Sequence, residues 1–237
     1  MIDIHAIRAI SFDLDDTLWP IWPVIERAEN ALVVWLTQHA PMTAALFASP
    51  SALREIREYM HDVVIKKKPE IAHDLSAIRK ESIRLALYRA KDDPLLADAA
   101  FEVFFAERNR VEYYEDAIPC VSELATRYPL ISLSNGNAQL HLVGLDNIFK
   151  TAVSAKTVGV AKPDKLIFQA AADAAGVAMH EMLHVGDDAA ADVVGALDAG
   201  MQAVWLNRQG KLWPHEQHQP TLEIASLAEL TALLVND

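Results

Sequence analysis

The sequence predicts an α/β fold, a doubly wound parallel sheet interrupted by an inserted helical domain. Short apolar runs recur after residue 127 without polar alternation, as expected of strands buried on both faces of a parallel sheet. Helix-like stretches alternate with these runs, which is typical of doubly wound sheets. One more apolar run precedes Asp13, and about 110 residues follow it before the next run. Because a crossover between parallel strands needs only a dozen or more residues, the excess indicates an insertion.

The expected core strands are residues 7–12, 129–133, 151–155, 182–185 and 202–206. Pro163 and Asp164 open a helix that Gly176 ends, since proline suits the first helical turn and glycine the position after the last. A second helix, residues 189–199, ends in the same way at Gly200. Residues 207–220 are expected to form a polar loop before a final helix at residues 226–234.

The insertion is expected to be helical throughout. Apolar residues at spacings of three and four predict helices at residues 24–39, 50–67, 75–90 and 94–110. Prolines at positions 41, 69 and 94 mark the breaks between them. We therefore expect a core domain made of residues 1–18 and 111–237, and a compact helical lid made of residues 19–110.

Composition narrows the class of protein. The chain of 237 residues is 52% hydrophobic, which is enough for a full core. Its formal charge of −12 argues against binding nucleic acid through the phosphate backbone. It has no apolar run of the roughly 18 residues that a membrane helix needs, and no leader-like start, so we expect a cytoplasmic protein. The single cysteine, Cys120, is expected in the core and not as a catalytic thiol.

The most informative motif is Asp13-Leu14-Asp15-Asp16-Thr17, directly after the first strand. Carboxylates two residues apart on an extended segment point to one side, so Asp13 and Asp15 are expected to converge. Their repulsion costs free energy unless a cation or a shared proton relieves it. The alternative is that Asp15 or Asp16 only caps the turn that follows.

Three further polar clusters each follow an expected strand. Ser134 and Asn135 begin a turn that can bind an anion through hydroxyl and N–H groups. Lys162 stands just before a helix. The third cluster offers carboxylate ligands for a hard cation, namely Asp187, Asp188 and Asp192. Because open α/β sheets bind ligands at the carboxyl ends of their strands, the four clusters together indicate phosphoryl transfer.

In this order the clusters resemble the four motifs of the haloacid dehalogenase superfamily: DxDx(T/V), a Ser/Thr before an Asn/Asp-Gly-like turn, a Lys, and GDxxxD. The resemblance implies a Rossmann-like core, and it implies that the insertion is a helical cap of the C1 type. Shorter strings, at residues 69–74, 134–139, 183–188 and 200–205, resemble the YigB-type flavin mononucleotide phosphatases within that superfamily.

The resemblance also implies roles for the acidic residues. Asp13 would be the nucleophile that forms an aspartyl-phosphate, and Asp15 would be the general acid and base. A magnesium ion, Mg2+, would be held by the Asp13 carboxylate, the Asp15 backbone carbonyl and Asp187. Asp188 and Asp192 would lie behind the residues that contact the metal, and they would hold metal-bound waters or Lys162 in place.

Three residues would contact the phosphoryl group. The resemblance implies that Ser134, Asn135 and Lys162 bind its oxygens and stabilise the charge of the transition state. Lys162 would thus serve both binding and catalysis. His184, in the strand before the last motif, is expected to be a core residue or one that supports the site from behind.

Substrate choice is expected to lie with the insertion. Trp19 or Trp22 would stack on a planar leaving group such as a flavin, although a tryptophan beside a hinge more often packs the two parts together. His73 is a weaker substrate candidate. The run Lys66 to Lys68 reads as a solvated helix end.

The expected reaction is magnesium-dependent hydrolysis of a small phosphomonoester, such as flavin mononucleotide or the phosphorylated riboflavin precursor. The alternatives are a phosphomutase, an enzyme like the 2-haloacid dehalogenases, and a non-catalytic binding member of the fold. Asp15 favours phosphate over halide, because a dehalogenase needs no acid at that position. We expect no nucleic-acid or membrane partner, and a monomer or a homodimer.

Overall fold

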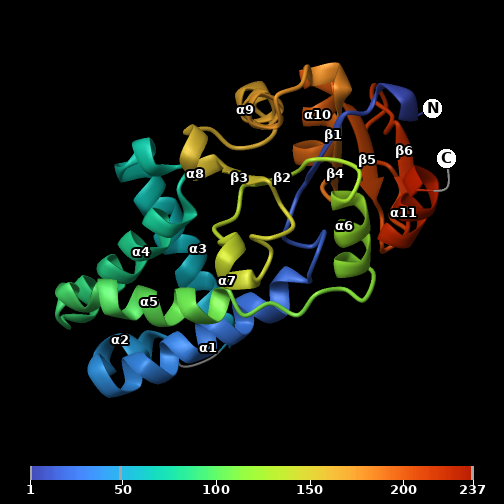
Figure 1. Ribbon diagram of the computed structural model, residues 1–237. Coiled ribbons are helices and arrows are strands. Elements are labelled where there is room, and N and C mark those ends of the chain that lie inside the picture. The colour runs from blue at the N-terminus through green and yellow to red at the C-terminus, as the bar shows by residue number, and fades with distance from the viewer. Residues whose placement is uncertain (1, 48–49, 236–237) are drawn as a thin grey trace. The chain divides into compact units, whose positions relative to one another are not determined.

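The computed structural model describes residues 2–47 and 50–235, with the backbone alone for residues 50–57. The chain forms two compact units. One is Met1–Pro20 with Glu112–Asp237, and the other is Ile21–Val111. The first unit contains the sheet and the second is helical (Figure 1). No helix among the described residues has the length and apolar character to cross a membrane.

The core unit is built on a six-stranded parallel sheet of order β3-β2-β1-β4-β5-β6. The strands are β1 Ala9–Phe12, β2 Leu130–Ser134, β3 Thr151–Ser154, β4 Met182–Gly186, β5 Gln202–Leu206 and β6 Leu222–Ile224. From β1 the chain moves outward through β2 to β3, and from β4 it moves outward the other way. The strand order therefore reverses beside β1, where sheets of this kind bind ligands.

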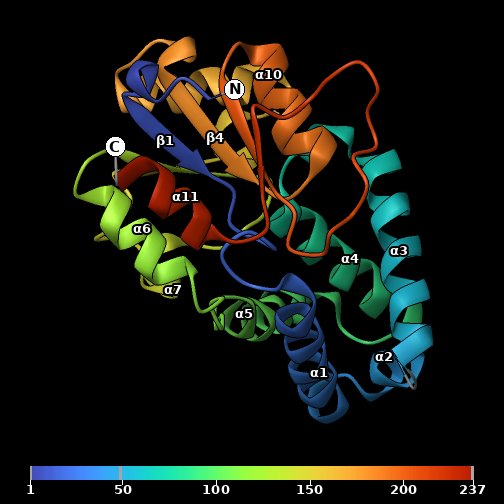
Figure 2. The ribbon, with the colours of Figure 1, turned by 90° about the vertical axis from the view of Figure 1, so that its right-hand side faces the viewer.

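Helices cover both faces of the sheet (Figures 1 and 2), with α9 and α10 on one face and α6 and α11 on the other. The helices of this unit are α6 Ala117–Ala125, α7 Leu140–Val143, α8 Ala155–Val158, α9 Lys165–Ala175, the π-helical η5 Ala189–Val194, α10 Gly195–Ala199 and α11 Leu227–Val235. All four residues of β1 are buried, which explains why its sequence shows no polar alternation. The prediction of a doubly wound α/β core is confirmed.

The second unit packs its helices around an apolar core of its own. Its elements are α1 Ile21–His39, α2 Pro41–Leu46, α3 Pro50–Lys67, η2 Pro69–Ile71, α4 Leu75–Ala90, η3 Pro94–Leu96 and α5 Ala97–Arg108. Leu32 and Leu36 of α1 meet Leu87 of α4 and Phe101 of α5 in this core. The four-residue spacing that predicted the helices is thus the spacing of their buried faces.

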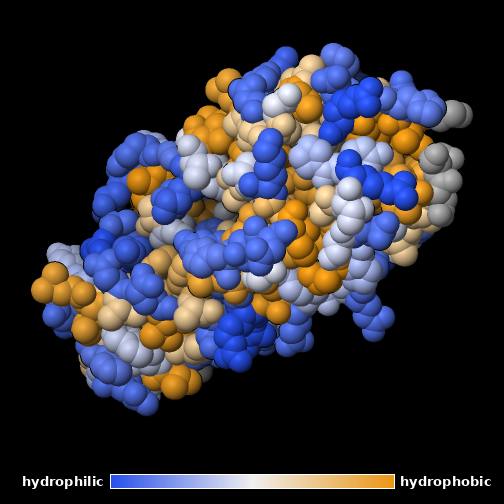
Figure 3. Space-filling view, viewed as in Figure 1, coloured by the Kyte–Doolittle hydropathy of each residue, from blue (hydrophilic) through white to orange (hydrophobic). Residues whose placement is uncertain are grey.

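The structure corrects several expected elements. The breaks fall just before Pro41, Pro69 and Pro94, and each of these prolines is itself the first residue of a short helix, where no N–H donor is needed. Helix α9 starts at Lys165, after Asp164 caps its first turn. The strand β6 and the short helices α2, α6, α7 and α8 were not predicted. Figure 3 shows polar and apolar residues interspersed over the visible surface.

Candidate active site

A tight turn after β1 places Asp13 at the carboxyl end of the sheet. The Asp13 N–H donates to the Val185 carbonyl of β4 at 2.9 Å, which continues the strand pairing by one residue. Beyond it, Asp16 adopts a left-handed φ of 57°, a conformation that aspartate tolerates better than most residues. The turn closes where the Asp16 N–H donates to the Trp19 carbonyl at 2.7 Å. The indole Nε1–H of Trp19 then donates to Asp15 Oδ1 at 2.9 Å, which fixes that carboxylate.

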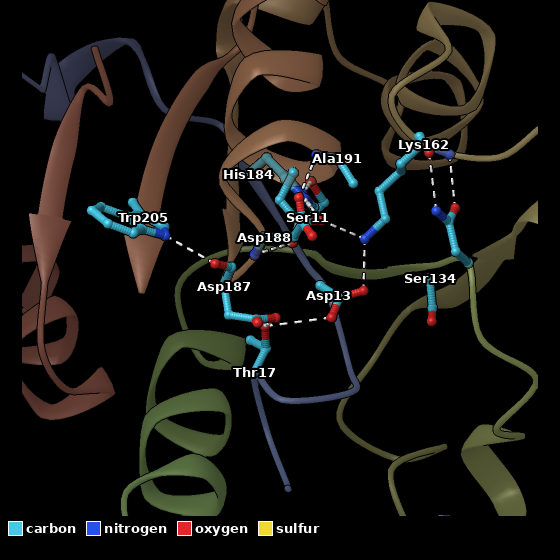
Figure 4. Close-up of polar contacts among 12 residues, drawn as sticks. Ser11, Asp13, Thr17, Ser134, Lys162, His184, Asp187, Asp188, Ala191 and Trp205 are labelled. Carbon is cyan, nitrogen blue, oxygen red and sulfur yellow. Dashed lines mark hydrogen bonds and ion pairs between the residues drawn. The ribbon is translucent and has the colours of Figure 1, made fainter. Parts of the chain in front are cut away.

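Lys162 lies between two buried carboxylates (Figure 4). Its Nζ is 2.6 Å from Asp13 Oδ1 and 2.5 Å from Asp192 Oδ1. Lys162 is 6% exposed, Asp13 7% and Asp192 1%, so water screens these charges poorly. The expectation that Asp192 holds Lys162 in place agrees with this geometry.

Asp187 joins the group from the end of β4. Thr17 Oγ1 lies 3.4 Å from Asp13 Oδ2 and 3.3 Å from Asp187 Oδ1, so its single hydrogen is shared by both carboxylates. The backbone carbonyl of Asp187 accepts a hydrogen bond from Trp205 Nε1 at 2.9 Å. Thr17, in the turn after β1, therefore contacts both acidic side chains, and Trp205 of β5 holds the backbone of Asp187.

The turn after β2 uses its side chains locally. The Asn135 side chain accepts from the Lys162 N–H at 2.7 Å and donates to the Lys162 carbonyl at 3.0 Å. Ser134 Oγ accepts from the Gly136 N–H at 2.9 Å. The hydroxyl hydrogen of Ser134 has no acceptor among the residues that the structure describes, so it is available to donate to an anion. Asn135 instead acts on the backbone of Lys162.

Asp188 caps a helix. Its Oδ1 accepts from the N–H groups of Ala190 and Ala191, at 2.9 and 2.7 Å, at the start of η5. The Asp188 N–H donates to Asp192 Oδ2 at 3.0 Å. Gly186 leaves room for Asp192, because a Cβ on that glycine would lie 2.3 Å from Asp192 Cγ. The backbone of this segment thus fixes Asp192, one turn into the helix.

Burial and crowding perturb the acidic groups. Burial raises the pKa of Asp13 well above its usual value, Lys162 opposes that shift, and the charges of Asp192 and Asp187 add to it. Burial and three neighbouring carboxylates raise the pKa of Asp187 to about 7. Although burial opposes it, contact with Lys162 and His184 lowers the pKa of Asp192. Asp192 is therefore the carboxylate that balances Lys162.

The donor set suits a hard divalent cation. Asp13, Asp187 and Asp192 each offer an oxygen, and these oxygens lie within 4.8 Å of one another. When all three carboxylates are ionised, the single ammonium group of Lys162 balances one of their negative charges and two remain. Mg2+ prefers a few carboxylate oxygens completed by waters and phosphate oxygens. The residues present therefore fit Mg2+, which the carboxylates of Asp13 and Asp187 would hold. Both oxygens of Asp192 already accept hydrogen bonds, Oδ1 from Lys162 and Oδ2 from the Asp188 N–H.

Residues 7–200 match the family model of the haloacid dehalogenase-like hydrolases. The chain belongs to this family. The resemblance drawn from the sequence motifs is therefore confirmed.

Named members of the haloacid dehalogenase-like family match most or all of the chain. The 5-amino-6-(5-phospho-D-ribitylamino)uracil phosphatase YigB of Escherichia coli is 34% identical over 96% of each chain. A phosphoserine phosphatase of Thermus thermophilus is 35% identical over 64% of this chain and 63% of its own. A structure titled 2-haloacid dehalogenase, from Pseudomonas syringae pv. Tomato DC3000, is 36% identical with a TM-score of 0.88, covering 97% of this chain and 99% of that one.

The three residues predicted to contact the substrate differ in how exposed they are. Trp19 is fully buried, stacks edge-on against Tyr113 at 5.6 Å and binds Asp15. Its ring has no exposed face for a ligand, and both of these partners belong to the same unit as Trp19. Trp22, on α1, is 65% exposed. His73 is partly buried in the turn before α4.

Sequence reasoning missed several residues that support the family site. Arg208, in the loop after β5, donates to the Thr17 carbonyl at 3.3 Å and to both Asp116 oxygens at 3.0 and 2.8 Å. Ser11 bonds the ring of His184 beneath the site. Trp205 holds Asp187. These residues lie inside strands or in a loop without a motif, so only their position in the folded sheet reveals them.

Proposed function

We propose that the protein is a magnesium-dependent phosphatase of small phosphomonoesters that works through an aspartyl-phosphate. The observation that carries the proposal is the placement of Asp13 2.6 Å from Lys162 Nζ and next to Asp187, at the carboxyl end of the sheet. Two relatives over much or all of the chain are named phosphatases, which supports the reaction class.

In the first step an Asp13 oxygen bonds to phosphorus as the ester P–O bond breaks. Asp15 gives its proton to the departing alkoxide. In the second step Asp15 takes a proton from water and the water oxygen bonds to phosphorus. The bond between the Asp13 oxygen and phosphorus breaks, which frees the Asp13 carboxylate and releases orthophosphate. Lys162 and the Ser134 hydroxyl stabilise the charge on the phosphoryl oxygens. When bound, Mg2+ would offset the repulsion between Asp13 and the phosphate.

The proposal extends to the substrate and to the helical unit. The 34% identity to YigB over 96% of each chain favours the substrate in its name, the phosphorylated ribitylaminouracil. Flavin mononucleotide is the second candidate, from the sequence motifs. We propose that the helical unit acts as a cap and that Trp22 and His73 contact the leaving group. If so, Trp22→Ala raises KM for flavin mononucleotide and leaves KM for phosphoglycolate unchanged, whereas an equal change for both esters would rule out stacking.

The test is phosphate release from a panel of esters, with and without magnesium, for the wild type and Asp13→Asn. The panel contains flavin mononucleotide, the phosphoribitylaminouracil precursor, phosphoglycolate, nucleoside monophosphates and sugar phosphates. Magnesium-dependent release that Asp13→Asn abolishes is the expected result. Release that persists in the variant would exclude Asp13 as the nucleophile, and interconversion of phosphate isomers would indicate a mutase.

Dehalogenation is the second candidate, because the structure at 36% identity carries that title. A halide leaves as a stable anion, so a dehalogenase gains nothing from a proton donor or a divalent cation. The partly buried Asp15 and the uncompensated charge around Asp187 therefore favour phosphate. Chloride release from 2-chloropropionate that survives a chelator would reverse this choice.

The proposal also covers the location of the protein, its oligomeric state and its partners. We propose a cytoplasmic enzyme, a monomer or a homodimer, without nucleic-acid or membrane partners. Light scattering coupled to size-exclusion chromatography gives the molar mass in solution, and a mass beyond that of two chains would contradict it. Retention on duplex DNA at physiological salt would contradict the absence of a nucleic-acid partner.

A further inference from the structure

A line of buried hydrogen bonds runs from Lys162 into the interior of the sheet (Figure 4). Beyond Lys162, Asp192 Oδ1 lies 3.2 Å from Nε2 of His184, and His184 Nδ1 lies 2.9 Å from Oγ of Ser11. His184 and Ser11 are 0% exposed. Neither can touch a substrate, so any effect they have on the reaction passes through Asp192.

The direction of each hydrogen bond follows from the charges. Asp192 is ionised beside Lys162, so it only accepts, and His184 must carry its hydrogen on Nε2. Burial lowers the pKa of His184, which keeps the ring neutral and leaves Nδ1 with a lone pair. Ser11 therefore donates to Nδ1. Every polar atom on the line has a matched partner.

The surroundings hold the line in one arrangement. Ser11 and His184 are partners in the register of β1 and β4, so the strand pairing itself sets their separation. Phe168, from α9, packs edge-on against the imidazole with ring centroids 5.4 Å apart. Asp192 Oδ2 is held separately by the Asp188 N–H. Asp192 consequently has few ways to rotate while His184 stays in place.

Resting on the proposed function, we propose that His184 and Ser11 are positioning residues that set the place of Lys162 through Asp192. Lys162 Nζ touches both Asp13 and Asp192, so a rotation of Asp192 moves the ammonium group relative to the nucleophile. A purely structural role would instead change stability and leave kinetic constants unchanged.

Two amide substitutions test the contacts of the two ring nitrogens of His184 one at a time. In His184→Gln the terminal NH2 group reaches the place of Nε2 and still donates to Asp192. In His184→Asn the shorter amide reaches Ser11 and leaves Asp192 without that donor. With an aryl phosphate and magnesium, we expect His184→Asn to lower kcat about 10- to 100-fold with KM nearly unchanged, as for other lost supporting contacts. We expect His184→Gln to restore most of kcat.

Ser11→Ala is compared with Ser132→Ala, a matched buried serine on the neighbouring strand β2. Only the first is expected to lower kcat. Urea denaturation of every variant separates unfolding from mispositioning. Equal kcat for His184→Asn and the wild type, or equal losses for His184→Asn and His184→Gln at equal stability, would overturn the proposal.

A measurement independent of activity is 15N NMR of histidine-labelled wild type, with the His184 signals assigned by their loss in His184→Gln. We expect a neutral ring protonated at Nε2, and a ring protonated at Nδ1 would overturn the hydrogen-bond line. If the wild type releases no phosphate from any ester, the proposed function fails together with the positioning role. The spectrum then still decides whether the line exists.

Discussion

The balance of buried charge around Lys162 is the main energetic constraint on single residues in the site. Lys162→Met leaves Asp13 and Asp192 buried without their cation. We expect a loss of about 3 to 5 kcal/mol in the free energy of unfolding, the usual result of removing one partner of a buried pair. Urea denaturation at pH 7 measures it. Lys165→Met removes an exposed lysine nearby and serves as the control.

The double variant Lys162→Met with Asp192→Asn tests the cause of that loss. It removes one buried negative charge along with the cation, so it is expected to be more stable than Lys162→Met alone. A double variant that is less stable than the single one would show that packing of the lysine stem, and not charge, decides the effect.

The position of Asp192 depends on the absence of a side chain at Gly186. Because a Cβ there would lie within 2.6 Å of three Asp192 atoms, Gly186→Ala must displace the Asp192 carboxylate. We expect loss of phosphatase turnover. Gly159→Ala is the comparison, since Gly159 has a φ of 90° but open space around it. That variant is expected to cost about 1 kcal/mol of stability while turnover persists.

For single residues, the sequence alone predicted those whose charged side chains can take part in binding or catalysis. Asp13 and Asp187 were predicted because charged groups directly after buried strands need a reason to be there, and Lys162 because a cation just before a helix is unfavourable unless an anion lies near it. Ser11 and Arg208 were not predicted, because a serine inside a strand and an arginine in a polar loop are ordinary. Their partners are far away in sequence, and no spacing rule links them.

At the scale of elements, the cap of η5 links helix stability to the site. Asp188→Ala removes the acceptor for two backbone N–H groups and is expected to cost about 0.5 to 2 kcal/mol, whereas Asp188→Ser keeps an acceptor. We also expect lower turnover for Asp188→Ala, since η5 carries Asp192. Asp93→Ala, which uncaps η3 in the helical unit, should affect stability alone. Equal turnover for both alanine variants would contradict the link.

Elements with a clear apolar pattern were predictable and the others were not. Strands β1 to β5 stand out as short apolar runs, and the long helices have buried residues at spacings of three and four. Strand β6 has three residues, one of them the exposed Glu223, and pairs only through β5. Helix α2 begins with a proline, which reads equally well as a break. The π-helical η5 has a rare geometry that local propensity does not predict.

For the molecule as a whole, Asp116 ties together segments that are distant in sequence. It accepts two hydrogen bonds from Arg208 and one, at 2.8 Å, from the Leu227 N–H at the start of α11. Arg208 in turn holds the turn after β1. Although burial alone would raise the pKa of Asp116, these hydrogen bonds and the Arg208 charge lower it. The ion pair between Arg208 and Asp116 therefore connects the turn after β1 with the start of α11.

Because the folded-state pKa of Asp116 is depressed, its stabilisation is complete at neutral pH and is lost as pH falls below about 4, the usual pKa of aspartate. The stability difference between the wild type and Asp116→Asn should shrink between pH 7 and 3. Urea midpoints at several pH values measure it. Arg208→Gln should show the same trend, and combining the two substitutions should add little. A difference that grows toward low pH would contradict the assignment.

The central place of β1 also affects how the enzyme is made. Ser11 is synthesised before its partner His184, which lies 173 residues later in the chain. At about 5 to 20 residues per second, roughly 10 to 35 seconds of synthesis separate the two. The first strand, which is fully buried in the finished protein, therefore waits without a neighbour while the helical unit is completed. The hydrogen-bond line through Ser11 and His184 can therefore form only after β4 has been synthesised.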